Sequence, residues 1–228
     1  MTRSYIPVLL ILTAALLGNC TGNAPVEESG LAAHWKFDEL TENGTMTPDS
    51  SGNGHHGQIH GQQLVEGIIG SALQFEGLDQ IVDIGDPGLS APATVTFWFR
   101  TVDLFRDRRL FSQVEGGESL AGALRLDGVQ VEVWDGAEWK ILIDRQMKIK
   151  EWMHVAVVFE PEGKTHGYLN GDRQHLVKSG FDFNGVKAAI GAPFLNETGN
   201  PYTGCMDDFR LYSRALSMDE IHSLYSAK

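Results

Sequence analysis

Residues 204–225, GCMDDFRLYSRALSMDEIHSLY, combine a strand pattern and a helix pattern in one short run. In the first half, Phe209 and Leu211 fall on one face of a period-two alternation, and the same period places Asp207 on that apolar face. Desolvating an unpaired carboxylate is costly. We therefore expect Asp207 to be protonated, bonded to several N–H groups or bound to a metal ion.

The second half of this stretch predicts a short helix. Ser217 and Glu220 have the spacing of a capping box, and Ile221, Leu224 and Tyr225 follow at helical spacing. No helical period of useful length precedes this point in the mature part of the chain. We therefore expect one C-terminal helix behind a long β region.

Short β-like runs at regular spacing fill residues 31–177. In the first run, residues 31–37, apolar residues alternate with more polar ones, as in a half-buried strand. The other runs lie at residues 72–75, 81–84, 94–100, 109–114, 122–126, 129–134, 138–143, 153–159, 167–169 and 173–177. Three dipeptides supply the positive φ angles of tight hairpin turns: Asp127-Gly128, Asp135-Gly136 and Asn170-Gly171. The spacing predicts an all-β antiparallel sandwich.

The composition limits the class of protein and its partners. At 228 residues the chain is long enough for one sizeable β domain, which we favour over two small ones. Its 18 Lys and Arg residues stand against 30 Asp and Glu residues, a net charge of −12. This acidic balance argues against nucleic acid or anionic lipid as the main partner, and it suits divalent cations or neutral ligands such as glycans.

The N-terminus has the pattern of an export signal. Arg3 precedes a mostly apolar run at residues 6–17, which is short for a membrane span but suits the hydrophobic region of a signal peptide. The run ends in LLGNC, which resembles a bacterial lipoprotein box with Cys20 as the lipidated residue. Asn19 departs from the small residue usual there, and plain signal-peptidase cleavage is the alternative. We expect a signal peptide over residues 1–20 and a flexible tether over residues 21–30.

Cys205 is the other cysteine of the chain. If Cys20 is lipidated or removed, Cys205 has no intramolecular partner, so the fold cannot depend on a disulfide. We expect a buried, inert thiol.

Several separated stretches resemble the laminin G-like jelly-roll domains of bacterial surface proteins. The run from Gly204 matches their C-terminal Asp-Asp-Phe-Arg-Leu-Tyr-x-Arg-Ala-Leu-Ser signature, and AHWKFDE at residues 33–39 matches their opening strand. DSSGNGHHG, IGSALQFEG and EWMHVAVVFEPEGKTHGYLNG lie between them in the expected order. The resemblance implies one jelly-roll domain over residues 31–228. Its two antiparallel sheets would be of the concanavalin A-like type, with the first and last strands near each other.

The loop DSSGNG at residues 49–54 packs oxygen-bearing side chains and glycines too densely for a helix or strand. Such a loop can wrap Ca²⁺, which takes about six to eight oxygen ligands, although a plain Asx turn is the commoner use of this pattern. We expect a structural Ca²⁺ held by Asp49, Asn53 and Asp207. Asp38 or Asp208 is the next choice.

The same broad fold also occurs in glycoside hydrolases, in which a strand presents a pair of carboxylates on one face. In VEVWDGAEW, Glu132 and Asp135 are three residues apart and point oppositely on a strand, and Glu138 lies across an expected turn. We interpret Glu132 and Glu138 as a chance pair of solvated charges. His154 is expected to be structural, and the sequence has neither a zinc-binding spacing nor a nucleophile elbow. These patterns favour a protein that is not an enzyme.

Two surfaces are candidates for ligand binding. Trp134 and Trp139 flank a turn, and two indoles there can stack on sugar faces. The competing interpretation, which we rank ahead, places one or both in the core, because Trp139 shares the register of apolar residues on its strand. The second surface is the loop before the last strand, with Phe194, Asn196, Asn200 and Tyr202.

We therefore expect an exported domain, anchored in the cell envelope through Cys20 or released as a periplasmic or secreted protein. Its expected role is non-catalytic binding or adhesion to glycans or another extracellular polymer. The alternatives are a structural or protein-interaction module of the envelope and, third, a glycoside hydrolase.

Overall fold

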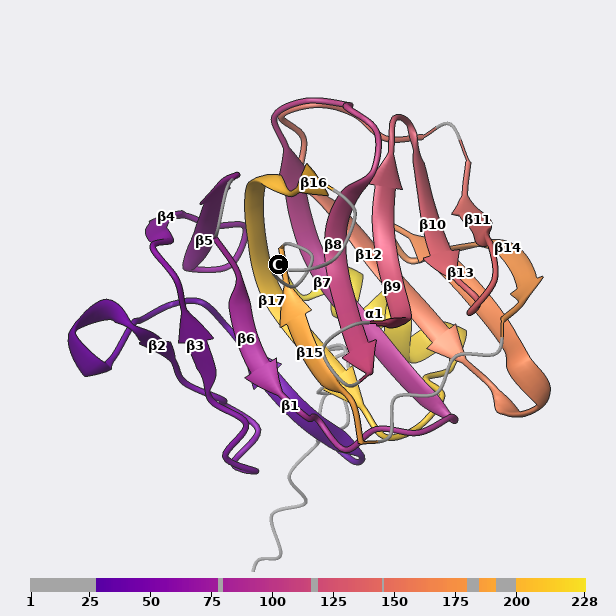
Figure 1. Ribbon diagram of the computed structural model, residues 1–228, viewed down its shortest axis with the longest axis horizontal. Coiled ribbons are helices and arrows are strands. Elements are labelled where there is room, and N and C mark those ends of the chain that lie inside the picture. The colour runs from indigo at the N-terminus through magenta and orange to yellow at the C-terminus, as the bar shows by residue number, and fades with distance from the viewer. Residues whose placement is uncertain (1–27, 78–79, 116–118, 145, 180–184, 192–199) are drawn as a thin grey trace, which may run out of the picture.

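The computed structural model describes residues 28–77, 80–115, 119–144, 146–179, 185–191 and 200–228 (Figure 1). They form two facing sheets with one α-helix, which confirms the predicted all-β jelly-roll sandwich. The signal peptide, most of the tether, Cys20, Phe194 and Asn196 lie outside the described residues. No helix among the described residues is long and apolar enough to cross a membrane.

The first sheet has eight strands and contains both the first and the last strand of the domain. Its order is β14 (Asp172–Lys178), β13 (Lys164–Leu169), β12 (Met153–Phe159), β7 (Ala93–Thr101), β17 (Thr203–Tyr212), β5 (Ser71–Glu76) and β4 (Gln63–Glu66), with β1 (Leu31–Trp35) also paired to β17. The pairing of β1 with β17 confirms the prediction that the first and last strands are neighbours.

The second sheet has nine strands and lies in front in Figure 1. Its order is β11 (Trp139–Ile143), β10 (Gln130–Trp134), β9 (Ser119–Asp127), β8 (Arg108–Glu115), β15 (Lys187–Ile190), β6 (Val82–Gly85), β3 (Gly57–Ile59) and β2 (Met46–Thr47), with β16 (Asn200–Pro201) paired to β8. The three predicted hairpin turns join β9 to β10, β10 to β11 and β13 to β14. Positive φ angles occur there at Gly128, Gly136, Asn170 and Gly171.

The core lies between the sheets, where alternate side chains of both meet. Phe209 stacks on Phe97 with ring centroids 5.0 Å apart and also contacts Trp35 and Phe111, at 6.0 and 5.9 Å. All four rings are fully buried. Burial of one such side chain contributes about 1.5–3 kcal/mol, so this aromatic group links both sheets to the last strand.

Helix α1 (Met218–Ser226) covers part of the outer face of the eight-stranded sheet and lies behind it in Figure 1. The predicted capping box is present, because the Glu220 N–H donates to Ser217 Oγ and the Ser217 N–H donates to a Glu220 carboxylate oxygen. A hydrogen bond from Arg214, with that of Ser217, lowers the pKa of Glu220 to about 2. Buried Ile221 and Leu224 then pack against the sheet.

Two short 3₁₀ turns, at Glu42–Gly44 and Pro161–Gly163, complete the described elements. Residues 28–30, expected to belong to the tether, instead rest on the domain. The Ser29 carbonyl accepts a hydrogen bond from Arg214 Nε at 2.6 Å, and the Gly30 carbonyl accepts one from the Ser213 N–H at 2.8 Å. The ordered domain therefore begins slightly before residue 31.

The predicted facing of Asp207 was wrong, because β17 contains a bulge. Asp207 pairs with Trp98 and Arg210 pairs with Thr96, so two residues of β17 oppose the single residue between them on β7. Asp208 has a φ of 49°, which permits the extra residue. Phe209 stays in the core, while Asp207, Asp208 and Arg210 all face outward beneath α1.

Candidate functional site

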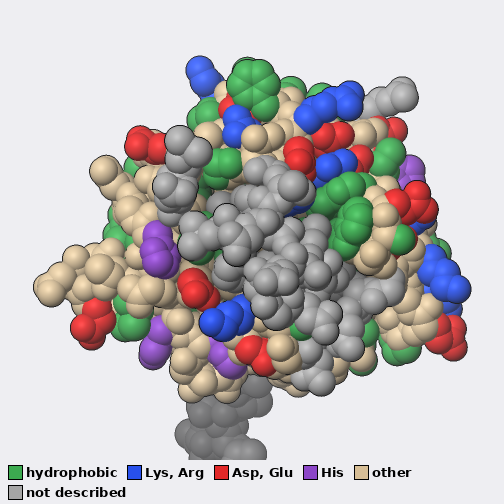
Figure 2. Space-filling model, in the orientation of Figure 1, with side chains coloured by type: hydrophobic (Ala, Val, Ile, Leu, Met, Phe, Trp, Pro, Cys, Tyr) green, Lys and Arg blue, Asp and Glu red, His purple; other side chains and the backbone are tan. Residues whose placement is uncertain are grey.

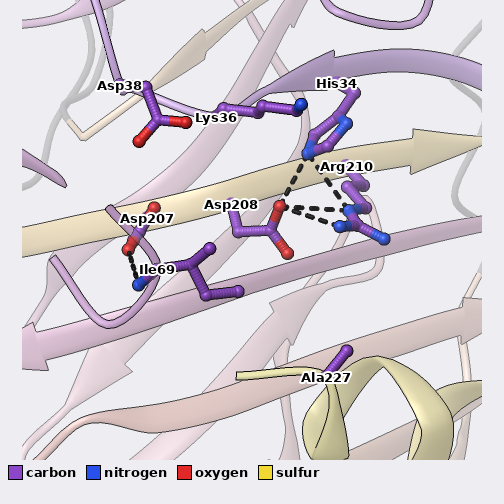
Figure 3. Close-up of a pocket in the computed structure, with 8 residues that line it drawn as sticks. All are labelled: His34, Lys36, Asp38, Ile69, Asp207, Asp208, Arg210 and Ala227. Carbon is purple, nitrogen blue, oxygen red and sulfur yellow. Dashed lines mark hydrogen bonds and ion pairs between the residues drawn. The ribbon is translucent and has the colours of Figure 1, made fainter. Parts of the chain in front are cut away.

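The bulge in β17 builds a polar site on the outer face of the eight-stranded sheet (Figure 3). Ala33 and Trp35 of β1 point into the core, so His34 between them points outward beside Asp208 and Arg210. His34 Nε2 lies 2.6 Å from Asp208 Oδ1, and Arg210 Nη2 donates to the same oxygen at 2.9 Å. Burial raises the pKa of Asp208, but the His34 hydrogen bond and the Arg210 charge outweigh it and hold the pKa below its ordinary value.

Asp207 is fully buried and only half satisfied. Its Oδ2 accepts hydrogen bonds from the Ile68 N–H at 2.9 Å and the Ile69 N–H at 3.0 Å, whereas its Oδ1 is buried with no hydrogen-bond partner. Burial, assisted by the charge of Asp208 and opposed by the two amides, raises the pKa of Asp207 to about 7. Of the three outcomes expected for this residue, bonding to backbone amides is present, and the raised pKa favours the protonated acid.

Asp38 binds the other end of the turn that contains Ile68 and Ile69. Its Oδ1 accepts a hydrogen bond from the Ser71 N–H at 2.9 Å, so Asp38 and Asp207 together clamp the turn between β4 and β5. Glycine is required there, since a Cβ on Gly67 would lie 2.5 Å from Asp207 Oδ2 and one on Gly70 would collide with Asp38. In Figure 3 the unpartnered oxygen of Asp207 points toward Asp38.

These side chains line a pocket of about 210 Å³. Its walls also include Lys36 and the end of α1 at Ala227. The pocket brings together three of the five predicted metal ligands, Asp38, Asp207 and Asp208. Among the residues that the structure describes, no group of three or more His, Cys, Asp or Glu side chains has the arrangement of a metal site.

The other two predicted ligands, Asp49 and Asn53, are used elsewhere. Asp49 Oδ1 accepts from the His34 and Ser51 N–H groups, and Oδ2 accepts from Ser51 Oγ and the His55 N–H, all within 3.0 Å. Asn53 Nδ2 donates to the Leu31 and Ala32 carbonyls. The DSSGNG loop thus adopts the Asx turn that we weighed as its alternative, and its side chains fasten it to β1. The expected convergence of this loop with Asp207 around one point is not observed.

A second site lies on the outer face of the nine-stranded sheet, at β10 and β11. Trp134 and Trp139 face each other across the hairpin with ring centroids 5.4 Å apart, tilted by 56°. Both are half-buried and neither belongs to the core, contrary to the interpretation that we ranked ahead. A register shift on β10 and β11 explains this, because it turns Leu142 inward and leaves Ile141 39% exposed.

Arginines and carboxylates surround Trp139. The guanidinium carbons of Arg125 and Arg109 lie 4.1 and 4.6 Å from the centroid of its ring. Arg125 also pairs with Glu132 at 2.7 Å and with Asp107 at 3.1 Å. Figure 2 shows hydrophobic side chains gathered over β10 and β11 beside acidic and basic ones. Arg109 and Arg125 were not predicted as site residues, although a count of outward positions on β8 and β9 next to the tryptophans would have indicated them.

The carboxylates near this site are paired with cations. Glu132 is bonded to Arg125, and Glu138 is bonded to Lys140. Asp135 accepts the N–H groups of Ala137 and Glu138, as expected of a turn residue. The proposed chance pair of Glu132 and Glu138 is therefore replaced by two separate ion pairs.

The remaining candidates have structural positions. Tyr202 is fully buried against Phe75 and Phe99, and this corrects its assignment to a binding surface. Its hydroxyl donates to the Cys205 carbonyl at 3.2 Å. His154 is buried with Nε2 2.7 Å from Thr96 Oγ1, and burial lowers its pKa to about 3, consistent with the expected structural role. Asn200 is exposed, and Cys205 is buried as predicted.

Comparison with known families places these features in context. Residues 76–222 match the family model described as the concanavalin A-like lectin/glucanases superfamily. The chain belongs to this family. A comparison with curated proteins finds no match.

Solved structures share the fold. Domain 4 of AbnA, a GH43 extracellular arabinanase from Geobacillus stearothermophilus solved with arabinotriose, matches 86% of this chain and 98% of that domain, at 24% identity and a TM-score of 0.70. A sialidase from Trypanosoma rangeli, solved with 2,3-difluorosialic acid, matches 93% of this chain at 15% identity and a TM-score of 0.70. The matched region is 35% of that sialidase chain, so the likeness covers about a third of its length.

Proposed function

We propose that this chain is a non-catalytic domain for binding or adhesion to glycans or another extracellular polymer, with the indole pair Trp134 and Trp139 as its contact surface. The carrying observation is that both indoles lie outside the core, side by side on one sheet face. Sugar rings present apolar C–H faces that stack on such surfaces, while nearby polar groups bind their hydroxyls. A fold neighbour solved with arabinotriose supports the choice of a carbohydrate.

The surroundings of Trp139 favour binding because they fix the ring in advance. Arg125 and Arg109 make cation–π contacts with the indole of Trp139. Both arginines form ion pairs with Asp107, and Arg125 also pairs with Glu132. A preorganised aromatic surface avoids the cost of about 0.5–1.5 kcal/mol for ordering each side chain when a ligand binds. Trp134 adds a second indole at an angle, which suits a chain of sugars more than a single flat ring.

A glycan array followed by titration calorimetry tests this proposal. We expect Trp134→Ala to weaken binding of the best glycan by about 5- to 150-fold, since loss of a sugar-stacking aromatic costs about 1–3 kcal/mol by analogy with base stacking. Trp152→Ala is the matched control, because Trp152 is also half-buried beside an arginine, Arg100, at 4.8 Å. Equal affinity of both variants would reject the indole pair. Binding to an envelope protein with no glycan affinity would favour the interaction module instead, and polysaccharide turnover would favour the hydrolase.

We further propose a structural Ca²⁺ in the pocket between Asp38 and Asp207, with Asp208 nearby. The support is the chemistry of the donors: Asp207 Oδ1 is a buried carboxylate oxygen without a hydrogen-bond partner, and Asp38 uses only Oδ1 in a described hydrogen bond. Asp49 and Asn53 fit less well, because their side chains already bond the backbone. An unchanged melting temperature on chelation would reject the bound ion.

Export and attachment through Cys20 remain part of the proposal. The support is the apolar run before LLGNC at the start of the chain. Mass spectrometry of the mature N-terminus in a bacterial host tests it. A diacylglyceryl group on Cys20 is expected for a lipoprotein, whereas an unmodified N-terminus near residue 20 would indicate plain cleavage.

A further inference from the structure

We propose that one end of the sandwich binds the surface of a phospholipid bilayer that carries anionic headgroups. Three loops form this end, at residues 102–107, 128–129 and 146–150. They hold four of the eight exposed large hydrophobic side chains in the described part of the chain. We call these four the apolar tip: Val102 (53% exposed), Phe105 (67%), Val129 (39%) and Ile149 (49%). A soluble domain rarely gathers its exposed apolar side chains in one place without an interaction.

Hydrogen bonds join the three loops to each other. The Lys150 N–H donates to the Thr101 carbonyl at 2.8 Å, which places Ile149 beside Val102. The N–H groups of residues 146 and 147 both lie within 3.5 Å of the Val129 carbonyl. These hydrogen bonds fix the backbone of the apolar tip, so its loops need little ordering to enter a membrane interface.

Two basic side chains at this end, Arg106 and Lys150, are available to bind anionic headgroups. Asp103 is bonded to Arg108 at 3.1 Å and to Thr203 Oγ1 at 2.8 Å, so its charge is already paired. Arg106 and Lys150 are exposed, and neither side chain has a hydrogen bond or ion pair with any described residue. In Figure 2 basic side chains flank a hydrophobic one at the top of the molecule.

Among the other charged side chains near the tip, Asp127 accepts the Asp107 N–H at 3.1 Å and Asp144 accepts Gln130 Nε2 at 2.7 Å. Asp107 is bonded to Arg109 and Arg125, and Lys148 is bonded to Glu151 at 3.0 Å. Apolar side chains with free cations beside them match the boundary between acyl chains and phosphates. The net charge of −12 opposes approach only weakly at physiological salt, because charges farther away than about 8 Å are screened. This local surface is thus an exception to the acidic balance of the whole chain.

Brominated vesicles locate the contact in the full chain, whether or not its N-terminus binds lipid. Phe105→Trp places a new indole at the apolar tip, and Leu176→Trp places one at a control position that is 54% exposed on β14. With vesicles of 70% phosphatidylcholine and 30% brominated phosphatidylglycerol, we expect the added fluorescence of Phe105→Trp to be quenched and that of Leu176→Trp to be unaffected. Equal quenching at the two positions would overturn the proposal.

Sedimentation with the same vesicles, without bromine, measures affinity. We expect Phe105→Ser combined with Ile149→Ser to lower the anionic-vesicle partition coefficient at least about tenfold, since two partly buried apolar side chains are lost. The matched control is Leu176→Ser with Met218→Ser, at 54% and 56% exposure. An unchanged coefficient in the tip variant would overturn the proposal. So would concentration-dependent self-association without lipid that the tip variant abolishes, because the surface would then bind a second copy.

Discussion

Asp207→Asn distinguishes two roles of Asp207 in the polar site, a buried acid and a metal ligand. Asparagine keeps an oxygen to accept the Ile68 and Ile69 amides and removes the charge. The pKa of Asp207 is raised from 3.8 to about 7, and each unit corresponds to about 1.4 kcal/mol. Ionisation of Asp207 in the metal-free fold therefore costs up to about 4 kcal/mol, and less where water enters the pocket.

The direction in which stability changes with pH follows from the difference between the folded and unfolded pKa values of Asp207. Because the folded pKa lies above the unfolded one, the stabilising contribution of the protonated acid is fully present below pH 3.8 and is lost as the pH rises through about 7. In EDTA, Asp207→Asn should therefore gain stability relative to the natural chain between pH 4 and pH 8, by about 2–4 kcal/mol. Urea unfolding of both proteins at these pH values measures the difference, and the other titrating groups cancel in the comparison.

Calcium should offset most of this difference in stability. If the ion binds the Asp207 carboxylate, the natural chain gains about 2.7 kcal/mol at a calcium concentration one hundred times the dissociation constant, and the variant gains much less. Asp38→Asn serves as a companion, since Asp38 faces the same pocket. A pH-independent difference between Asp207→Asn and the natural chain, in EDTA and in calcium alike, would refute both the buried acid and the bound ion.

Three other changes test the fold and its loops by denaturant unfolding. Phe209→Ala should destabilise the domain by about 3–5 kcal/mol, because it leaves a cavity among three aromatic rings in contact with it, and a loss below about 1 kcal/mol would contradict its central place. Ser217→Ala removes the helix cap and should cost about 1 kcal/mol, whereas Ser223→Ala, inside the same helix, is the control and should cost less. Asp49→Asn places an amide donor against N–H and O–H donors and should cost about 1–3 kcal/mol of stability near pH 7. This loss should shrink as the pH falls below about 4, because hydrogen bonds hold the Asp49 pKa below its ordinary value. Calcium should leave the loss of stability unchanged if Asp49 is only a turn residue.

Sequence patterns predicted the long strands and their turns well. Period-two alternation is strong in residues 153–159 and 94–100, and each run appears as a central strand with nearly the predicted bounds. The short strands β2, β3, β4, β15 and β16 were not predicted, because two to four residues carry too little alternation to detect and their place is set by neighbouring strands.

The candidate site was predicted less well, for a specific reason. Period two assumes an unbroken strand, and the extra residue at Asp208 reverses the facing of everything before it. A second register shift moved Trp139 away from the core. The pairs that define the sites, Asp208 with His34 and Arg125 with Glu132, join different strands, and their register depends on tertiary packing that one sequence does not display.

The central place of β17 has a consequence for the order of folding. This strand follows the other described strands in the sequence, yet it separates β7 from β5 and also pairs with β1. Until it arrives, the eight-stranded sheet has two unpaired strand edges in its middle, and the aromatic core lacks Phe209. Such long-range pairing is slow to form, so the eight-stranded sheet should stay open until β17 has been synthesised. A chain cut before residue 203 should therefore aggregate or be degraded.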